Sequence, residues 1–246
     1  MFPFQIGIQA FTASNPSHWM QCRSQARKNG RVASGRASGV KHLPSCCADQ
    51  LVRCGDPEQG AAESNYFIVP KRDRRLHPVL DLRALNSALR KFRFKMLTTK
   101  LIASQIRSED WFVTIDLKDA YFHLGIRPEH RKFLKFAFGG KVYQFQVLPF
   151  SLALLPLTFT KCMDAALALL RLQGIRVLNY LDDWLILAHS KAMAASHRDV
   201  LLAHMRSLGL RITPEKCVLS PSQGSTFLGA LLYVALDKSV CQIPEM

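Results

Sequence analysis

Three aspartates stand where a folded chain normally avoids unpaired charge. Asp116 directly follows the apolar segment WFVTI, and Asp182 and Asp183 lie much further along the chain, between two other apolar segments. A buried carboxylate is costly and clustered carboxylates repel one another, so adjacent strand ends would leave these three in need of cations. Hard divalent ions such as Mg²⁺ prefer oxygen ligands, and two of them about 4 Å apart stabilise the attacking and leaving oxygens of a phosphoryl displacement. The three aspartates are therefore candidate ligands for two metal ions.

The doublet Asp182-Asp183 also fits a second interpretation. Aspartate is a common turn residue, and two of them between apolar segments can form a plain, solvated polar turn. Taken by itself, the doublet is weak evidence for catalysis. Both interpretations stay open at this point.

The composition is that of a globular protein with an unusual charge. Of the 246 residues, 48% are hydrophobic and 21% are charged, which argues against wholesale disorder. The 33 Lys and Arg against 18 Asp and Glu give a formal charge of +15, which points to nucleic acid or an acidic membrane surface as partner. Residues 71–107 are especially basic. A solvated face would also be basic, but this density favours a surface that follows a phosphate backbone.

Several classes of protein are excluded or disfavoured. The longest apolar stretch, 148–159, is short and is interrupted by Pro and Ser, so no membrane span is expected. The first residues lack the charged segment of a secretory signal. The seven cysteines are odd in number and scattered, which fits reduced thiols better than a disulfide framework. We therefore expect an intracellular protein of the cytoplasm or nucleus, not a secreted one.

The elements that must position the aspartates begin near Tyr66. Residues 1–64 show no sustained hydrophobic period, and we expect them to form a poorly ordered basic leader. Beyond them, apolar runs and turn residues predict an α+β fold, a sheet with helices on one face. The predicted strands are 66–69, 79–82, 111–115, 132–138, 142–147, 175–180, 184–188, 210–212 and 226–231, with a hairpin turn at Gly139-Gly140 and helices at 155–172 and 191–208.

Seven motifs, in order and with the right spacing, resemble those of reverse transcriptases. Three are the palm motifs of that family: DLKDAYFH at 116–123, LPF at 148–150 and YLDD at 180–183. The other four are VPK at 69–71 and VLDLRALN at 79–86 upstream, and LGLRITPEK at 208–216 and FLG at 227–229 downstream. The resemblance covers residues 65–231. The residues of these motifs are most similar to those of DIRS-like retrotransposons, and next to those of the Gypsy-like class.

This resemblance implies a fold and an activity. The fold would be the polymerase right-hand palm, a ferredoxin-like βαββαβ sheet with helices on one face, plus fingers. Residues 1–64 would be a leader, 65–231 the fingers and palm, and 232–246 a short tail, with no thumb. The activity would be RNA-directed DNA polymerase in a shortened or weakened copy, with two Mg²⁺ or Mn²⁺ ions, an RNA template, a DNA primer and a dNTP, and no membrane partner. Intact relatives also carry RNase H, and the oligomeric state stays open.

The resemblance also assigns roles to single residues. Asp116, Asp182 and Asp183 would hold the two metal ions, and Lys216 would protonate the leaving pyrophosphate unless it is merely solvated. Tyr121 would lie below the sugar and clash with a ribose 2′-OH, unless it is simply a core aromatic. The remaining nucleotide-binding residues would be Lys71, His77, Asp119, Ala120, Phe150 and Ser151. The template and primer residues would be Phe227, Leu228, Gly229 and Arg83, the last of which could instead pair with Asp81.

Two departures from the family pattern weaken the expected site. Ser151 stands where the family has a glycine that lets the backbone approach the template, so we expect strain there. His77 replaces an arginine that grips the triphosphate, and a mostly neutral imidazole cannot form that fork. Reverting Ser151 to Gly and His77 to Arg together should then raise incorporation. The alternatives are a catalytically dead nucleic-acid-binding remnant and, ranked lower, an RNA-dependent RNA polymerase.

Overall fold

The computed structural model describes residues 8–9, 52–54, 64–70, 76–90, 92–138, 141–234 and 239–242. The chain forms two compact units. Unit 1 comprises residues 1–90 and 121–155, and unit 2 comprises residues 91–120 and 156–246. Within the described ranges, no helix is long and apolar enough to cross a membrane.

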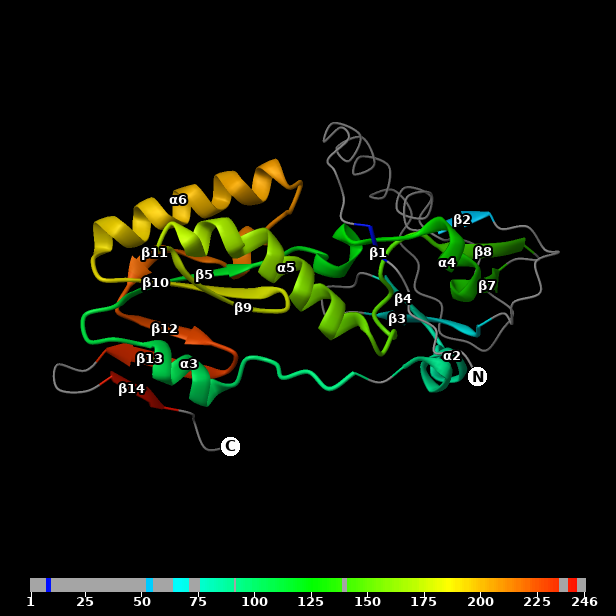
Figure 1. The fold of residues 1–246 in the computed structure, drawn as a ribbon, viewed down its shortest axis with the longest axis horizontal. Coiled ribbons are helices and arrows are strands. Elements are labelled where there is room, and N and C mark those ends of the chain that lie inside the picture. Colours follow the sequence, from blue (N-terminus) through cyan, green and yellow to red (C-terminus); the bar gives the residue numbers. More distant parts are fainter. Residues whose placement is uncertain are drawn as a thin grey trace. The chain divides into compact units, whose positions relative to one another are not determined.

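Unit 2 is built on a four-stranded antiparallel sheet (Figure 1). Its strands are β5 (Trp111–Asp116), β9 (Arg176–Tyr180), β10 (Asp183–Ala188) and β11 (Val218–Ser222), in the spatial order β11-β5-β10-β9. The central strands β5 and β10 are buried on both faces, which is why their sequences are nearly continuous apolar runs. With α5 and α6, described next, the chain order is βαββαβ, which confirms the predicted fold class.

Helix α6 (Lys191–Ser207) packs on one face of this sheet, and α5 (Leu155–Leu172) lies beside α6. The hydroxyl of Ser190 accepts a hydrogen bond from the amide of Met193 and so caps α6, and Gly209, with φ +73°, follows its end. The imidazole Nε2 of His204 lies 2.8 Å from the carbonyl oxygen of Ala166, so the two helices lie side by side. Both helices begin where the sequence predicts.

The opposite face is covered by α3 (Thr99–Gln105) and by a small sheet of β12 (Gly224–Phe227), β13 (Ala230–Val234) and β14 (Ser239–Gln242) (Figure 1). These elements and the large sheet share one buried cluster: Ile102, Ile106, Phe112, Leu185, Leu187, Phe227, Ala230 and Leu232. The predicted single strand 226–231 is wrong, because a two-residue turn divides it into two strands. The predicted strand 210–212 is also wrong, since only Ile212 forms an isolated bridge, to Leu117.

Among its described residues, unit 1 holds three small strand groups. They are the hairpin β3 (Tyr66–Pro70) and β4 (Leu76–Leu80), the sheet of β2 (Val52–Cys54), β8 (Lys141–Phe145) and β7 (Lys135–Phe138), and the pair β1 (Ile8–Gln9) and β6 (Gly125–Ile126). Its helices are α2 (Arg83–Ala88), α4 (Pro128–Arg131) and two 3-10 turns, η3 (Ala120–His123) and η4 (Lys132–Leu134). The predicted strand 132–138 therefore begins only at Lys135. The predicted strand 79–82 ends at Leu80.

The structure describes only some of the residues in the domains predicted from the sequence. The expected leader, 1–64, contains the strands β1 and β2, which pair with β6 and β8, and the rest of it before Ser64 lies outside the described residues. Lys71 and Gly139-Gly140 also lie outside them. The expected boundary at residue 231 falls inside β13, so the small sheet continues beyond it.

Candidate active site

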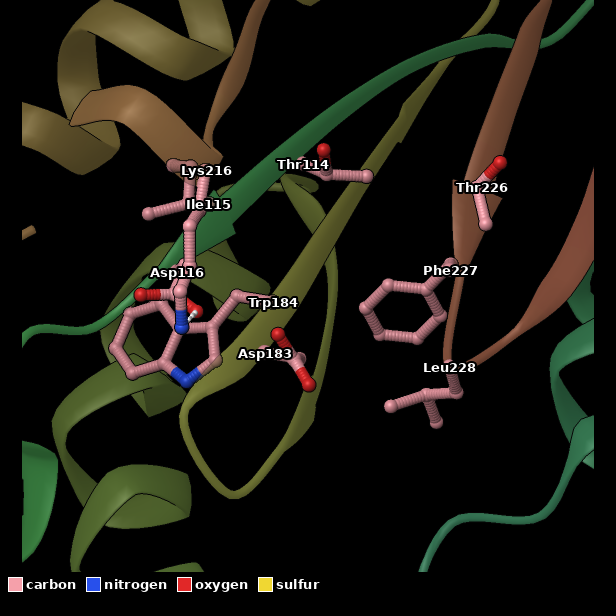
Figure 2. Close-up of a pocket in the computed structure, with 9 residues that line it drawn as sticks. All are labelled: Thr114, Ile115, Asp116, Asp183, Trp184, Lys216, Thr226, Phe227 and Leu228. Atoms are coloured by element: carbon pink, nitrogen blue, oxygen red, sulfur yellow. Dashed lines mark hydrogen bonds and ion pairs between the residues drawn. The ribbon is translucent and has the colours of Figure 1, made fainter. Parts of the chain in front are cut away.

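Two of the three predicted carboxylates lie opposite one another at the end of the large sheet. Asp116 is the last residue of β5 and Asp183 the first of β10, and the antiparallel register pairs them directly. Both line a pocket together with Lys216, Phe227 and Leu228 (Figure 2). The strand pairing thus joins an acid from each of two motifs that are far apart in the chain.

The turn between β9 and β10 carries Asp182. Tyr180 pairs with Asp183, so Leu181 and Asp182 form a two-residue turn in which Leu181 has a φ of +51°. This left-handed backbone is unfavourable for leucine, and the turn is held from two sides. The indole Nε1 of Trp184 donates to the Leu181 carbonyl oxygen over 3.0 Å, and the amide of Leu117 donates to the Asp182 carbonyl oxygen over 2.8 Å.

The segment 211–217 braces the end of β5 from the other side. The amide of Thr213 donates to the carbonyl oxygen of Asp116 over 2.8 Å, and the amide of Asp116 lies 3.3 Å from the sulfur of Cys217. The 3-10 turn η5 (Pro214–Lys216) follows and carries Lys216 toward the carboxylates. The backbone hydrogen bond between Thr213 and Asp116 therefore positions Lys216, the predicted proton donor.

Lys216 forms an ion pair with Asp116. Its Nζ lies 3.1 Å from Oδ2 of Asp116, with side-chain exposures of 65% and 10%. The hydrogen bond to Asp116 raises the pKa of Lys216, so the amine stays protonated. The alternative of a merely solvated Lys216 is therefore wrong: the side chain is exposed, but it has a partner.

Burial and the clustering of negative charge raise the pKa of Asp183. Burial, followed by the charges of Asp182 and Asp116, raises the pKa of Asp183 to about 6, and Lys216 offsets only part of this effect. Carboxylate oxygens that share one pocket and repel one another fit a hard divalent cation. The candidate metal ligands are Asp116 and Asp183, which the strand register pairs, and Asp182 on the adjoining turn. Among the described residues, no three His, Cys, Asp or Glu side chains already lie close enough together to hold a metal ion.

The predicted primer residues reach the same pocket. Phe227 pairs with Ala230, and the two residues between them have left-handed backbones, with φ of +52° for Leu228 and +77° for Gly229. This is the geometry of a type I′ hairpin, in which glycine is favoured and leucine is strained. Phe227 and Leu228 line the pocket with Asp183 (Figure 2).

The predicted nucleotide-binding residues are divided between the two units. Asp119, with a φ of +50°, and the buried Ala120 belong to unit 2, whereas the others belong to unit 1. There, the ring of Phe150 meets the rings of Tyr121 and Phe122 edge-on, with centroids 5.0 and 5.3 Å away. The backbone of His77 pairs with Val69 in the β3–β4 hairpin.

Arg83 forms an ion pair with a neighbouring acid. Its Nη2 lies 2.6 Å from Oδ2 of Asp81, and this pairing lowers the pKa of Asp81 to about 2. The alternative role for Arg83, pairing with Asp81, is thus confirmed. A contact of Arg83 with template stays a prediction.

The backbone of Ser151 is not in the left-handed region. Among the described residues other than glycine, positive φ occurs at Glu109, Asp119, Leu181 and Leu228, and not at Ser151. The hydroxyl of Ser151 instead donates to the carbonyl oxygen of Leu80 over 2.6 Å. The side chain of Ser151 therefore has a backbone acceptor within unit 1, and the expected cost of this side chain toward a template stays a prediction.

Sequence reasoning missed Asn86 and Cys217. Asn86 bonds to the loop that carries Phe150, and Cys217 supports the backbone of Asp116. Asn86 is the last residue of the motif VLDLRALN, and Cys217 directly follows Lys216. Their positions in or beside a motif were the available signals. Their roles could not be predicted from the sequence, because the residues that they contact lie far away in the chain.

Comparison with known proteins agrees with this geometry. The family described as "Reverse transcriptase (RNA-dependent DNA polymerase)" matches residues 69–232. The enzymatic polyprotein of Cestrum yellow leaf curling virus is 29% identical over 198 residues, covering 76% of this chain and 29% of the polyprotein. The Gag-Pol polyprotein of Walleye dermal sarcoma virus is 26% identical over 202 residues, covering 80% and 11%. The Transposon Tf2-3 polyprotein of Schizosaccharomyces pombe is 25% identical over 157 residues, covering 64% and 12%.

A solved structure shows the same fold. The foamy viral protease-reverse transcriptase in complex with double-stranded DNA superposes with a TM-score of 0.65 at 20% sequence identity, covering 75% of this chain and 31% of that one. This likeness confirms the predicted palm and fingers. The chain spans less than a third of the length of the relatives described above.

Proposed function

The chain belongs to the reverse transcriptase (RNA-dependent DNA polymerase) family, and from this premise we propose that it catalyses RNA-directed DNA synthesis. In this reaction a primer 3′-OH attacks the α-phosphate of a dNTP and releases pyrophosphate. One observation carries the proposal: the strand register sets Asp116 against Asp183, in a pocket that also contains Lys216 and the tip of the β12–β13 hairpin.

The candidate residues suggest how the catalytic roles are divided. Asp116, Asp182 and Asp183 would hold two Mg²⁺ or Mn²⁺ ions, which, when bound, lower the pKa of the attacking hydroxyl and hold the leaving pyrophosphate. Lys216, protonated beside Asp116, is a donor for the proton that the leaving group needs. Phe227 and Leu228 would hold the primer end near the carboxylates. Tyr121 would select deoxyribose by excluding a 2′-OH.

The partners of this reaction follow from charge and family. A formal charge of +15 suits an RNA template paired with a DNA primer. Foamy viral protease-reverse transcriptase, which has the same fold, has been solved in complex with double-stranded DNA and with an RNA/DNA hybrid. The segment YLDDWLILA at 180–188 supports an origin in a DIRS-like or Gypsy-like retrotransposon. Among the residues that the structure describes, Cys162 and Cys217 are free thiols, which suits a protein that acts inside the cell.

The direct test is incorporation of dTTP on poly(rA)·oligo(dT) with Mg²⁺ or Mn²⁺. We expect Asp182→Asn to lower the rate about a thousandfold, because it removes a charge that balances those of the ions. Asp164→Asn, on the exposed side of α5, is the matched control and should leave the rate unchanged. Activity that survives Asp182→Asn would contradict the assignment.

A second candidate is a nucleic-acid-binding remnant without turnover. It is favoured by His77, which replaces the family's arginine. This candidate predicts duplex binding that weakens with salt and no incorporation with either metal. The same assay therefore separates the two candidates.

A further inference from the structure

Three hydrogen bonds join the loop after Phe150 to the segment around α2. The hydroxyl of Ser151 donates to the carbonyl oxygen of Leu80 over 2.6 Å. The amide nitrogen Nδ2 of Asn86 donates to the carbonyl oxygen of Ser151 over 2.8 Å, and Oδ1 of Asn86 accepts from the amide of Ala153 over 2.8 Å. We call this set the Asn86–Ser151 clamp. All its members belong to unit 1.

The clamp fixes the loop at Ser151 and at Ala153. The side-chain amide of Asn86 donates to the carbonyl oxygen of Ser151 and accepts from the amide of Ala153. Because both ends of the side-chain amide are bonded, its plane is held in one orientation. The side chain of Ser151 adds a third tie to a different element, the end of β4. The backbone of Ser151 is thereby held through both its carbonyl and its side chain.

What the clamp holds in place is Phe150, the residue before Ser151. The ring of Phe150 stands edge-on to Tyr121, at an interplanar angle of 86°, and to Phe122, at 90°. Edge-on packing is directional, so a displacement of the Phe150 backbone would move the ring that supports Tyr121. Tyr121 is itself only 9% exposed, and its position depends on such neighbours.

We propose that Asn86 and Ser151 are positioning residues for sugar discrimination: the clamp holds Phe150 against Tyr121 and so gives the tyrosine ring one position below the incoming sugar. This inference rests on the proposed function and deepens it. It also reverses the sequence-based expectation for Ser151. The serine adds a tie to the loop, so Ser151→Gly should weaken discrimination and should not restore activity.

The test compares kcat/KM for dUTP with kcat/KM for UTP, two nucleotides that differ only at the 2′ position, and reports their ratio. We expect the ratio to fall about fivefold in Ser151→Ala and in Asn86→Ala, because each loses directional bonds of the clamp. Ser151→Thr, which keeps the hydroxyl, should restore most of the ratio. Ser87→Ala is the matched control, because it removes an equivalent bond, from the Ser87 hydroxyl to the Ala84 carbonyl oxygen, that does not reach the loop. A ratio in Ser151→Ala equal to that of Ser87→Ala overturns the proposal.

A second measurement does not depend on activity. Hydrogen exchange of residues 148–155 should be about tenfold faster in Asn86→Ala than in the unaltered protein, and unchanged in Ser87→Ala. Unchanged exchange in Asn86→Ala overturns the clamp, whatever the kinetics. If the unaltered protein incorporates no nucleotide, the proposed function and the role in discrimination both fail, and the exchange result still decides whether the clamp exists.

Discussion

Asp183 is the carboxylate of the site whose charged form is disfavoured by burial and by its acidic neighbours. It sits half-buried, opposite one carboxylate and next to another, with a single lysine as counter-charge in the pocket. Its raised pKa means that the folded protein without metal binds a proton there more tightly than the unfolded chain does. The stability that Asp183 contributes is then complete below its ordinary pKa, near 4, and is lost as the pH rises through about 6.

Replacing Asp183 by Asn should therefore stabilise the metal-free protein above pH 6. We expect a gain of about 1 kcal/mol at pH 8, after discounting for solvent screening of a half-exposed group, and little change at pH 4. Urea unfolding in EDTA at the two pH values measures this. A stability difference that does not change between pH 4 and pH 8 would show that Asp183 is not the titrating group.

At the scale of elements, the buried Asp110 ties the loop after α3 to β9. Asp110 has no exposed surface and accepts two hydrogen bonds from the Arg176 guanidinium, at 2.7 and 3.1 Å, and one from the amide of Arg107, at 2.8 Å. β5 begins at the next residue. The pair therefore fixes the far end of the strand whose near end carries Asp116.

Breaking this pair should destabilise the whole of unit 2. We expect Asp110→Ala to lower the free energy of unfolding by about 3–5 kcal/mol, because the arginine would be left partly buried without its counter-charge. Asp164→Ala, which removes the more exposed partner of Arg171, should cost less than about 1 kcal/mol. Urea denaturation of the two variants compares the costs directly. Equal losses would contradict the structural role of Asp110.

At the scale of the whole molecule, the charge of +15 leads us to expect that the proposed binding of nucleic acid weakens with salt. Arg93, Lys95, Lys100 and Arg107 are exposed on the segment that opens unit 2. If six to ten phosphates are neutralised, affinity for an RNA/DNA duplex should fall about 10³- to 10⁵-fold between 50 and 200 mM salt. Lys95→Gln should lower the slope of log K against log salt by about 0.9, and Lys161→Gln, on α5, should not. Fluorescence anisotropy titrations measure both slopes.

The sequence by itself determined the parts of the protein that depend on neighbours in the chain. Apolar runs predicted β5, β9 and β10, and the periodic apolar positions before Gly209 predicted α6. These signals are local, since a strand or helix is specified by residues within a few positions of one another. The ordered motifs added the family and the three aspartates. Where local signals were ambiguous, as for the two strands of 226–231, the prediction failed.

Only the tertiary structure decided how the distant parts meet. The register of β5 and β10, the ion pair of Lys216 with Asp116 and the burial of Asp110 join residues that are far apart in the chain. Ser151 shows the reason most clearly. From the sequence its side chain was an obstacle, but in the fold the carbonyl of Leu80 lies within hydrogen-bond distance of its hydroxyl. Whether a side chain strains or ties the backbone depends on which partner packing brings to it, and no local pattern encodes that partner.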